Sequence, residues 1–345
     1  MKSICLFSYD IKVTGIKIIL NNIQKKLGSV NLPIETDIEK ALQYDVVLPY
    51  GILPCYDLLK RDKSKCTLAL MVDAESLTNI SKYRYLVGKT KTVPFKERYM
   101  DLLRYFFHTW QERKIFEAYD KIMLVSYYDK QYYEKKCGTK KNAHKIIVVP
   151  NGVNLPETPR KEHTIDGQFV LGFLSEWWSG DGDLTSERKS FLEYVWKDAY
   201  RENPNMKLLM CGRGMTERQK EYFKQYPNVE GIGEVESLNT FFDQIDASII
   251  VNVKHAGILN KALDSFAYQC PVIGEPHNFW AFKDIPDCFY LYTDGKSLAE
   301  SVKRIKENKE EVEKKIEEAY KYIQEYHDWD KNYSVLCDEI EKLIV

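Results

Sequence analysis

Short apolar runs alternate with segments of helical apolar spacing through the first half of the chain. This alternation predicts strands that are separated by helices. Strands are expected over residues 3–8, 45–48, 67–72, 121–125 and 145–149, and helices over residues 15–27 and about 96–118. In the longer helix, apolar residues recur every three or four positions, at Tyr99, Leu103, Phe106 and Trp110. That spacing is typical of one apolar helix face.

A polar segment with Pro156 and Pro159 follows residue 152 and indicates a linker. A second alternating series begins after it. Strands are expected over residues 169–174, 207–211, 228–231, 247–251 and 271–274, and helices over about 186–202, 237–243 and 260–269. Apolar residues at helical spacing from Leu298 to Leu343 predict a helical end, with a break at residues 327–330.

The alternation in both halves predicts an α/β fold of two Rossmann-like domains that face each other across a cleft. Each domain would hold a parallel sheet with helices on both faces. The expected division is an N-terminal domain over residues 1–152, a linker over 153–166, a C-terminal domain over 167–326 and a last helix over 327–345. Ligands of such sheets bind beyond the carboxyl ends of the strands, so the cleft is the expected binding site.

Length and composition bound the class of protein. A chain of 345 residues is too long for one ordinary core and suits two domains. No run approaches 18 apolar residues, so no transmembrane helix is expected, and the first apolar run is too short for a signal peptide. The eight cysteines form no CxxC pair, and the six histidines show no ligand spacing. We therefore expect a cytoplasmic protein with reduced cysteines and no metal site.

The two halves carry opposite charge. Residues 1–152 hold 26 Lys and Arg against 16 Asp and Glu, a net charge of +10, and the remainder holds 24 against 35, a net charge of −11. Basic residues interleave with aromatic ones between Lys82 and Lys114. This segment predicts a surface for an anionic membrane, although a solvated lysine-rich surface is an equal alternative. No recognised motif accompanies the charge, so no nucleic-acid partner is expected.

Four passages of the sequence follow each other at characteristic separations. They are Thr14-Gly15 at the first helix start; Trp110–Arg113 (WQER) through Ser126 to Val148–Asn154 (VVPNGVN); Leu208–Gly212 (LLMCG) with Val229–Val235 (VEGIGEV); and Gly257–Ala267 (GILNKALDSFA) with Pro271–Ile273 (PVI). In this order they resemble the retaining family 4 glycosyltransferases of the GT-B fold, of the bacterial polysaccharide type. The resemblance covers most of the chain, and the last passage is the most specific.

The resemblance implies an activity, partners and one further fold feature. The enzyme would transfer a sugar from a UDP- or GDP-linked donor to a glycan or lipid-linked acceptor, with retention, in cell-surface polysaccharide synthesis. The N-terminal domain would lie on the acceptor side and the C-terminal domain would bind the donor. No metal or other cofactor would be required. The protein would be cytoplasmic, with its basic surface as a candidate peripheral contact with the inner membrane face, and its last helix would cross back onto the N-terminal domain.

The helix start from Gly257 to Asp264 would bind the donor nucleotide. Without a Cβ, Gly257 would let the backbone approach phosphate oxygens, and the ammonium of Lys261 would stabilise the leaving diphosphate. Asp264 shares a helix face with Asn260 and Lys261, and would accept hydrogen bonds from ribose hydroxyls. The alternative is an amphipathic helix with a surface ion pair.

Further candidates come from other loops. Gly15 is the N-terminal counterpart at the diphosphate, and Arg213 and Gly233 are expected near the nucleotide. Asp73 follows a strand and is expected at the cleft as a second catalytic residue, although a helix N-cap is an equal alternative. His255 borders the donor site in sequence. Glu112 and Arg113 are interpreted as an ion pair within one helix rather than an acceptor contact.

The sequence also departs from the family pattern. The acid expected eight residues before Asp264 is replaced by Ala256, and the basic residue after the first C-terminal strand is replaced by Phe173, for which Arg188 or Lys189 would have to substitute. These changes leave the donor sugar open. They also keep two alternatives, a sugar-nucleotide epimerase of the same fold and a non-catalytic partner subunit. The Asp181-Gly182-Asp183 sequence is interpreted as a turn and not as a metal site.

Overall fold

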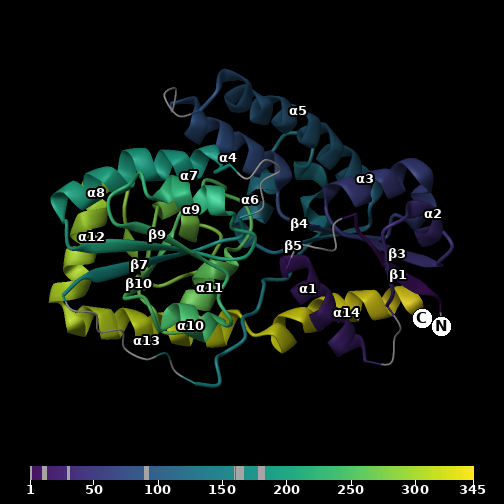
Figure 1. Cartoon of the computed structure of the whole chain (residues 1–345). Helices are drawn as coiled ribbons and strands as arrows, with labels where there is room; N and C mark the ends of the chain where they lie inside the picture. The colour runs from purple at the N-terminus through teal and green to yellow at the C-terminus, as the bar shows by residue number, and fades with distance from the viewer. Residues whose placement is uncertain are drawn as a thin grey trace.

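The computed structural model describes residues 2–9, 14–28, 32–88, 93–158, 160, 167–177 and 183–345. It shows two lobes side by side, one with strands β1 to β6 and the other with strands β7 to β12 (Figure 1). Every strand pairing among the described residues is parallel. The predicted α/β class with parallel sheets is therefore confirmed.

The N-terminal lobe contains two three-stranded sheets joined at their edges. Their strands are β1 (Ile4–Phe7), β2 (Ile34–Glu35), β3 (Val46–Pro49), β4 (Leu68–Val72), β5 (Lys121–Leu124) and β6 (Ile146–Val148). The orders are β2-β1-β3 and β4-β5-β6, and a bridge between Tyr50 and Leu70 connects them. All residues of β1 and β3 are buried, as expected for parallel strands covered on both faces.

Helices cover both faces of these sheets. They are α1 (Thr14–Leu27), α2 (Ile38–Ala41), α3 (Ile52–Arg61), α4 (Glu75–Val87), α5 (Phe95–Ala118) and α6 (Tyr127–Lys135), with short turns η1 (Lys63–Lys65) and η2 (Lys140–Lys145). Leu20 and Ile23 of α1 pack with Leu48 and Leu70 on one face. Ile115 of α5 packs with residues of α3, β4 and β5 on the other.

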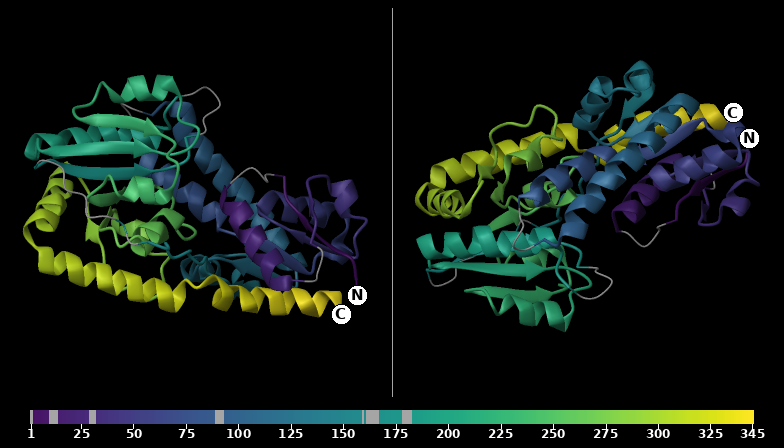
Figure 2. Two further views of the ribbon diagram at one scale, coloured as in Figure 1. Left: turned by 60° about the horizontal axis from the view of Figure 1, so that its bottom comes forward. Right: turned by 90° about the horizontal axis from the view of Figure 1, so that it is seen from above.

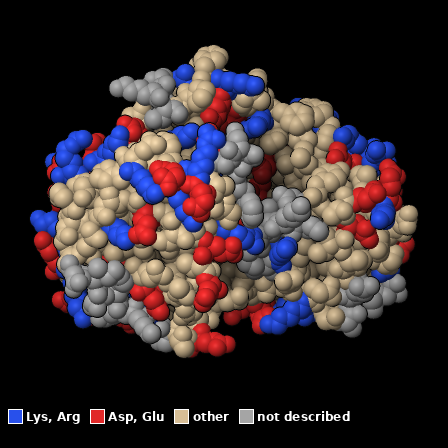
Figure 3. Space-filling view, viewed as in Figure 1, with Lys and Arg blue, Asp and Glu red and all other residues tan. Residues whose placement is uncertain are grey.

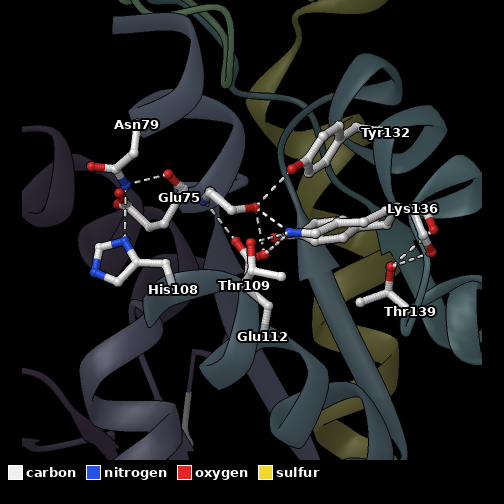
Figure 4. Close-up of polar contacts among 10 residues, drawn as sticks. Glu75, Asn79, His108, Thr109, Glu112, Tyr132, Lys136 and Thr139 are labelled. Carbon is white, nitrogen blue, oxygen red and sulfur yellow. Dashed lines mark hydrogen bonds and ion pairs between the residues drawn. The ribbon is translucent and has the colours of Figure 1, made fainter. Parts of the chain in front are cut away.

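Helix α5 agrees with the predicted bounds, but its apolar stripe faces outward. Leu103, Phe106 and Trp110 are 62%, 61% and 47% exposed, whereas Gln111 and Glu112 are buried. The reason is a polar network between α4, α5 and α6 (Figure 4). Glu112 accepts hydrogen bonds from the backbone and side chain of Ser76 and forms an ion pair of 2.8 Å with Lys136.

The predicted Glu112–Arg113 pair is therefore wrong. Glu112 pairs with Lys136, which lies just after α6, and Arg113 pairs with Glu117 at 3.0 Å on the exposed side of the helix. Adjacent residues on a helix point in different directions, so a contact between them was geometrically unfavourable.

The C-terminal lobe holds one six-stranded sheet of order β12-β11-β10-β7-β8-β9. Its strands are β7 (Phe169–Leu174), β8 (Met206–Cys211), β9 (Val229–Gly233), β10 (Ala247–Ile250), β11 (Val272–Gly274) and β12 (Tyr290–Leu291). Its helices are α7 (Ser186–Phe191), η3 (Leu192–Trp196), α8 (Lys197–Glu202), α9 (Glu217–Phe223), α10 (Leu238–Phe242), α11 (Asn260–Ala267), η4 (Pro276–Phe279), α12 (Gly295–Glu307) and α13 (Lys309–Tyr326). The expected helix over 186–202 is continuous, with η3 as a π-helical stretch inside it.

The chain end returns to the N-terminal lobe, as Figure 2 shows. Helix α14 (Trp329–Ile344) packs Leu336 and Ile340 into the same core as Leu20 and Ile23 of α1. The predicted crossing helix is thus confirmed. The two chain ends meet there, because the Lys2 backbone N–H donates to the Ile344 carbonyl at 3.0 Å. Among the described residues, no helix is both long enough and apolar enough to cross a membrane.

Candidate functional site

The start of α11 faces the N-terminal lobe and carries no side-chain cap. Gly257, three residues before the helix, has a φ of +73°, which favours glycine. Lys261 is the second residue of α11, and its Nζ lies 5.2 Å from the centre of the Phe173 ring. Uncapped backbone N–H groups at a helix start attract anions. The feature is therefore suited to a phosphate.

Two cations meet at this helix start. The Arg188 guanidinium, from α7, lies 4.2 Å from the centre of the Trp177 ring and donates to the Ser175 hydroxyl and the Glu176 carbonyl. Burial lowers the pKa of Lys261 to about 8, and the charges of Arg188 and Lys254 contribute to this lowering. Burial also lowers the pKa of Arg188. A bound anion would relieve the repulsion between these two cations.

Two carboxyl groups of the N-terminal lobe lie against Gly257. Its backbone N–H donates to Oδ2 of Asp129, from α6, at 3.0 Å. A Cβ at Gly257 would lie 2.3 Å from Oδ1 of Asp73, so the residue must be glycine for this approach. Asp73 follows β4 directly, after Val72 with a φ of +71°. A left-handed conformation is strained for a β-branched residue and is maintained only by its surroundings.

The two carboxyl groups retain protons to unusually high pH. Burial raises the pKa of Asp73 to about 6, with the charge of Glu75 adding to the effect and Lys254 opposing it. Burial and the charge of Asp73 raise the pKa of Asp129 well above its usual value. Oδ1 of Asp129 is buried without a hydrogen-bond partner among the described residues. Two interacting carboxyls of this kind hold a proton near neutral pH.

Asp264, Asn260 and Arg213, three other predicted site residues, are found in the following surroundings. Asp264 lies on α11 with Lys261, and burial raises its pKa to about 7. Asn260 accepts a hydrogen bond of 2.9 Å from Asn151, and so contacts the segment between the lobes. Arg213 forms an ion pair of 3.1 Å with Glu176, whose carbonyl accepts from Arg188.

No described contact joins Gly233 or Gly15 to the cations at α11 or to the carboxyls beside Gly257. Gly233 ends β9 with a φ of +75°, and its carbonyl accepts from the Gly212 backbone N–H at 2.8 Å. Gly15 is in the first turn of α1, but its surroundings lie outside the described residues. Asp181 and Gly182 also lie outside them, and Asp183 forms an ion pair of 2.8 Å with Arg218.

Two neighbours of the site, Ala256 and His255, pack against other side chains. Ala256 is buried among the core residues of the N-terminal lobe, so an acid at this position would enter an apolar contact between the lobes. His255 packs against His277 with ring centres 4.5 Å apart. Burial lowers the pKa of His255 to about 4, which makes its imidazole neutral at pH 7.

Asp129 has no functional signature in the sequence. Its position has a local explanation instead, since Ser126 caps α6 by accepting from the Asp129 backbone N–H at 3.0 Å. A Ser-x-x-Asp sequence before a helix is typical of a cap. The contact of Asp129 with Gly257 spans 128 positions and leaves no local pattern. Arg188, in contrast, is one of the two residues expected to substitute for the missing cation.

The site lies between the lobes, where the space-filling view shows a hollow with acidic atoms inside it (Figure 3). Among the described residues, no three His, Cys, Asp or Glu side chains gather as metal ligands would. The acceptor atoms present are instead the two carboxyls beside Gly257, and the positive groups lie at α11. The arrangement suits a ligand with an anionic part at α11 and hydroxyl groups toward Asp73 and Asp129.

Comparison with known proteins defines the class of fold. Neither a family model nor a curated protein matches the sequence. Solved structures match along the whole chain, and the fold that they share with it is the GT-B fold of glycosyltransferases. Sucrose-phosphate synthase of Thermosynechococcus elongatus is similar with a TM-score of 0.73 and 14% identity, covering 99% of each chain.

Two further solved structures are similar to the chain. HepE of Anabaena, in complex with UDP-glucose, gives a TM-score of 0.68 at 11% identity and covers 99% of this chain and 100% of its own. A UDP-forming α,α-trehalose-phosphate synthase of Burkholderia xenovorans gives 0.64 at 11% identity and covers 100% of both chains. At such identities the similarity establishes the fold.

Proposed function

We propose that this protein is a glycosyltransferase that moves a sugar from a UDP- or GDP-linked donor to a glycan or lipid-linked acceptor. The observation that carries the proposal is the pair of cations, Lys261 and Arg188, at an uncapped helix start opposite the Asp73 carboxyl. This arrangement fits a diphosphate joined to a sugar. A neighbour of the same fold that holds UDP-glucose supports the choice of ligand.

In the proposed reaction the bond between the sugar C1 and the diphosphate oxygen breaks, and its electron pair goes to that oxygen. Lys261 and the N–H groups of α11 stabilise the charge that develops there. The acceptor oxygen bonds to C1 on the face that the diphosphate leaves, which gives retention, and the hydroxyl proton passes to the leaving phosphate. Asp73 contacts a sugar or acceptor hydroxyl, and Asp264 contacts the ribose. The cations perform the task that a metal ion performs elsewhere, so no metal is required.

The wider role is part of the same proposal. We place the enzyme in cell-surface polysaccharide synthesis, with a hexosyl donor, in the cytoplasm and at the inner membrane face. The basic first half of the chain, with a net charge of +10 over residues 1–152, supports an anionic membrane there. Nucleic acid is not a proposed partner.

The proposal is tested at Lys261. Candidate nucleotide sugars are first ranked by the thermal shift that they produce, because ligands of the native state raise its melting temperature. With the best donor, Lys261→Ala is expected to lower turnover about 100- to 1000-fold while circular dichroism stays unchanged. Lys309→Ala, on α13 of the same lobe and 77% exposed, is the control, and wild-type activity is expected to persist in EDTA. A folded Lys261→Ala enzyme with normal turnover would refute the assigned role.

One observation favours a second candidate, a sugar-nucleotide epimerase. Such an enzyme needs acids in the cleft, and Asp73 and Asp129 are carboxyls with raised pKa values beside the site. Incubation of the donor without an acceptor separates the two activities, because an epimerase then releases a free sugar nucleotide with an altered sugar configuration. A non-catalytic partner subunit, motivated by Ala256 and Phe173, predicts no consumption of any donor.

A further inference from the structure

The outer side of α5 is an apolar surface that the described chain leaves largely exposed. Five large side chains form it and are between 47% and 68% exposed: Phe95, Leu103, Phe106, Phe107 and Trp110. We call this set the α5 ridge. Their spacing of three, four and seven positions from Leu103 onward places them along one side of the helix. In the view from above, α5 lies in front of both lobes (Figure 2).

The ridge cannot turn inward, because the opposite side of α5 is fixed by polar contacts. Glu112 is fully buried against Ser76 and Lys136, and the buried carboxylate of Asp101 lies within 3.8 Å of Lys82 and 3.1 Å of Arg104. A rotation of α5 that hid the ridge would break its ion pairs with other elements, Glu112–Lys136 and Asp101–Lys82. An apolar patch held at the surface in this way marks an interaction site.

Cations surround the ridge. Among the exposed basic side chains on α5 and the adjacent α3–η1 segment are Lys60, Lys63, Arg104, Arg113 and Lys114. Lys60 pairs with Asp57, Arg104 with Asp101, and Arg113 and Lys114 share Glu117, so cations outnumber acids there. Between α3 and α5 lies a groove of about 270 Å³ with Tyr56 and Trp110 in its lining. Three lysines, Lys60, Lys63 and Lys114, and one acid, Glu117, also line it. Aromatic rings next to ammonium groups suit an acyl chain below a phosphate headgroup.

We propose that the α5 ridge docks the protein on an anionic lipid surface. Its apolar side chains enter the boundary between headgroups and acyl chains, and the surrounding cations contact lipid phosphates. The inference rests on the proposed function for its purpose, which is to bring the site to a lipid-linked acceptor. The geometry agrees: Glu97, in the first turn of α5, accepts a hydrogen bond of 2.6 Å from Ser186, the first residue of the helix that carries Arg188.

The test is co-sedimentation of the full chain with vesicles of phosphatidylcholine, with or without phosphatidylglycerol in equal parts. The wild type is expected to bind the anionic vesicles only. Phe106→Ser with Phe107→Ser is expected to weaken this binding about tenfold, and Lys60→Glu with Lys114→Glu by a similar factor. Val335→Ser, 48% exposed on α14, and Lys309→Glu, 77% exposed on α13, are the matched controls and should bind as the wild type does.

Three outcomes would overturn the proposal. They are unchanged binding in both ridge variants, equal binding of the wild type to neutral vesicles, and a dimer in sedimentation velocity that the ridge variants abolish without any lipid binding. The last outcome would assign the ridge to a second copy of the chain. Lys261→Ala and donor consumption in solution separate this result from the proposed activity, since the ridge variants should keep solution turnover and Lys261→Ala should keep vesicle binding.

Discussion

Burial and two neighbouring cations disfavour the charged form of Lys261. Donor binding is therefore expected to depend on pH. The pKa of Lys261 is lowered to about 8, so the ammonium form prevails at pH 7 and is lost as the pH rises through 8. The affinity for a nucleotide diphosphate is therefore expected to fall above about pH 8. Calorimetric titration with the nucleotide at several pH values checks this.

Lys261→Arg is the informative control for that titration. A guanidinium stays protonated throughout this range, so the variant should bind with an affinity that changes little above pH 8. A wild-type affinity that is flat across pH 8 would contradict the placement of the diphosphate at Lys261. Titration of Asp264 is distinguished in the same experiment, because its pKa of about 7 would change binding at a lower pH than Lys261 does.

At the residue scale, the sequence marks residues that share one continuous motif, but it does not show which distant residues the fold brings beside them. Lys261, Asp264 and Gly257 lie in one continuous motif, and the structure places them at one helix start. The closeness of Asp73 to Gly257 was not predictable, because it depends on how the two lobes meet. Asp129 already had a local explanation as part of a helix cap.

At the scale of elements, the loop before α11 depends on glycine for two separate reasons. Gly257 has a positive φ and also lies against the Asp73 carboxylate. Gly257→Ala is therefore expected to be destabilised by more than the roughly 1–2 kcal/mol of the conformational strain, and to lose nucleotide binding. Thermal denaturation and nucleotide titration measure both effects.

Gly28→Ala isolates the conformational effect. Gly28 has a φ of +55°, and no atom of the residues that the structure describes lies within 4 Å of the place that a Cβ would occupy, so strain is the expected effect of its substitution. It should lower the melting temperature less than Gly257→Ala and should not change nucleotide affinity. Equal losses of stability in the two variants would show that the contact between Gly257 and Asp73 is unimportant.

Elements with an apolar inner side could be predicted from the sequence. Helix α4 could not, because its buried side is partly polar. Its buried residues include Ser76, Asn79 and Ser81, so it has no clear apolar period. The apolar period of α5 was visible, but its direction was not, because the polar partners that turn it outward come from α4 and from the residue after α6. Periodicity reveals a helix with two unlike sides and cannot say which side is covered.

At the scale of the whole molecule, α14 closes the core of a lobe whose other elements all come from the first half of the chain. Tyr333, Leu336 and Ile340 are at most 1% exposed within that core. A chain that ends at residue 327 is expected to lose most of the stability of its N-terminal lobe, since burial of each such side chain contributes roughly 1.5–3 kcal/mol. Denaturant unfolding followed by tryptophan fluorescence and circular dichroism measures the loss.

Deletion of Val345 alone is the control for that truncation, because this residue is 97% exposed. It should unfold as the full chain does. A truncated chain that keeps its unfolding midpoint would contradict the role given to α14. The crossing helix itself was expected from the resemblance, whereas its packing partners on α1 were not identifiable from the sequence.

The two passages of the chain between the lobes touch each other, and this has a mechanical meaning. The Val153 backbone N–H donates to the His327 carbonyl at 2.9 Å, the His327 ring bonds to the Asn151 carbonyl at 2.6 Å, and Gly152 lies against the Trp329 ring. Two coupled passages at one place act as a single pivot with one preferred axis. The lobes should then rotate about it as rigid bodies, with small displacements near the pivot itself. The longest travel should fall at the far tips, where Ser186 and Glu97 are in contact.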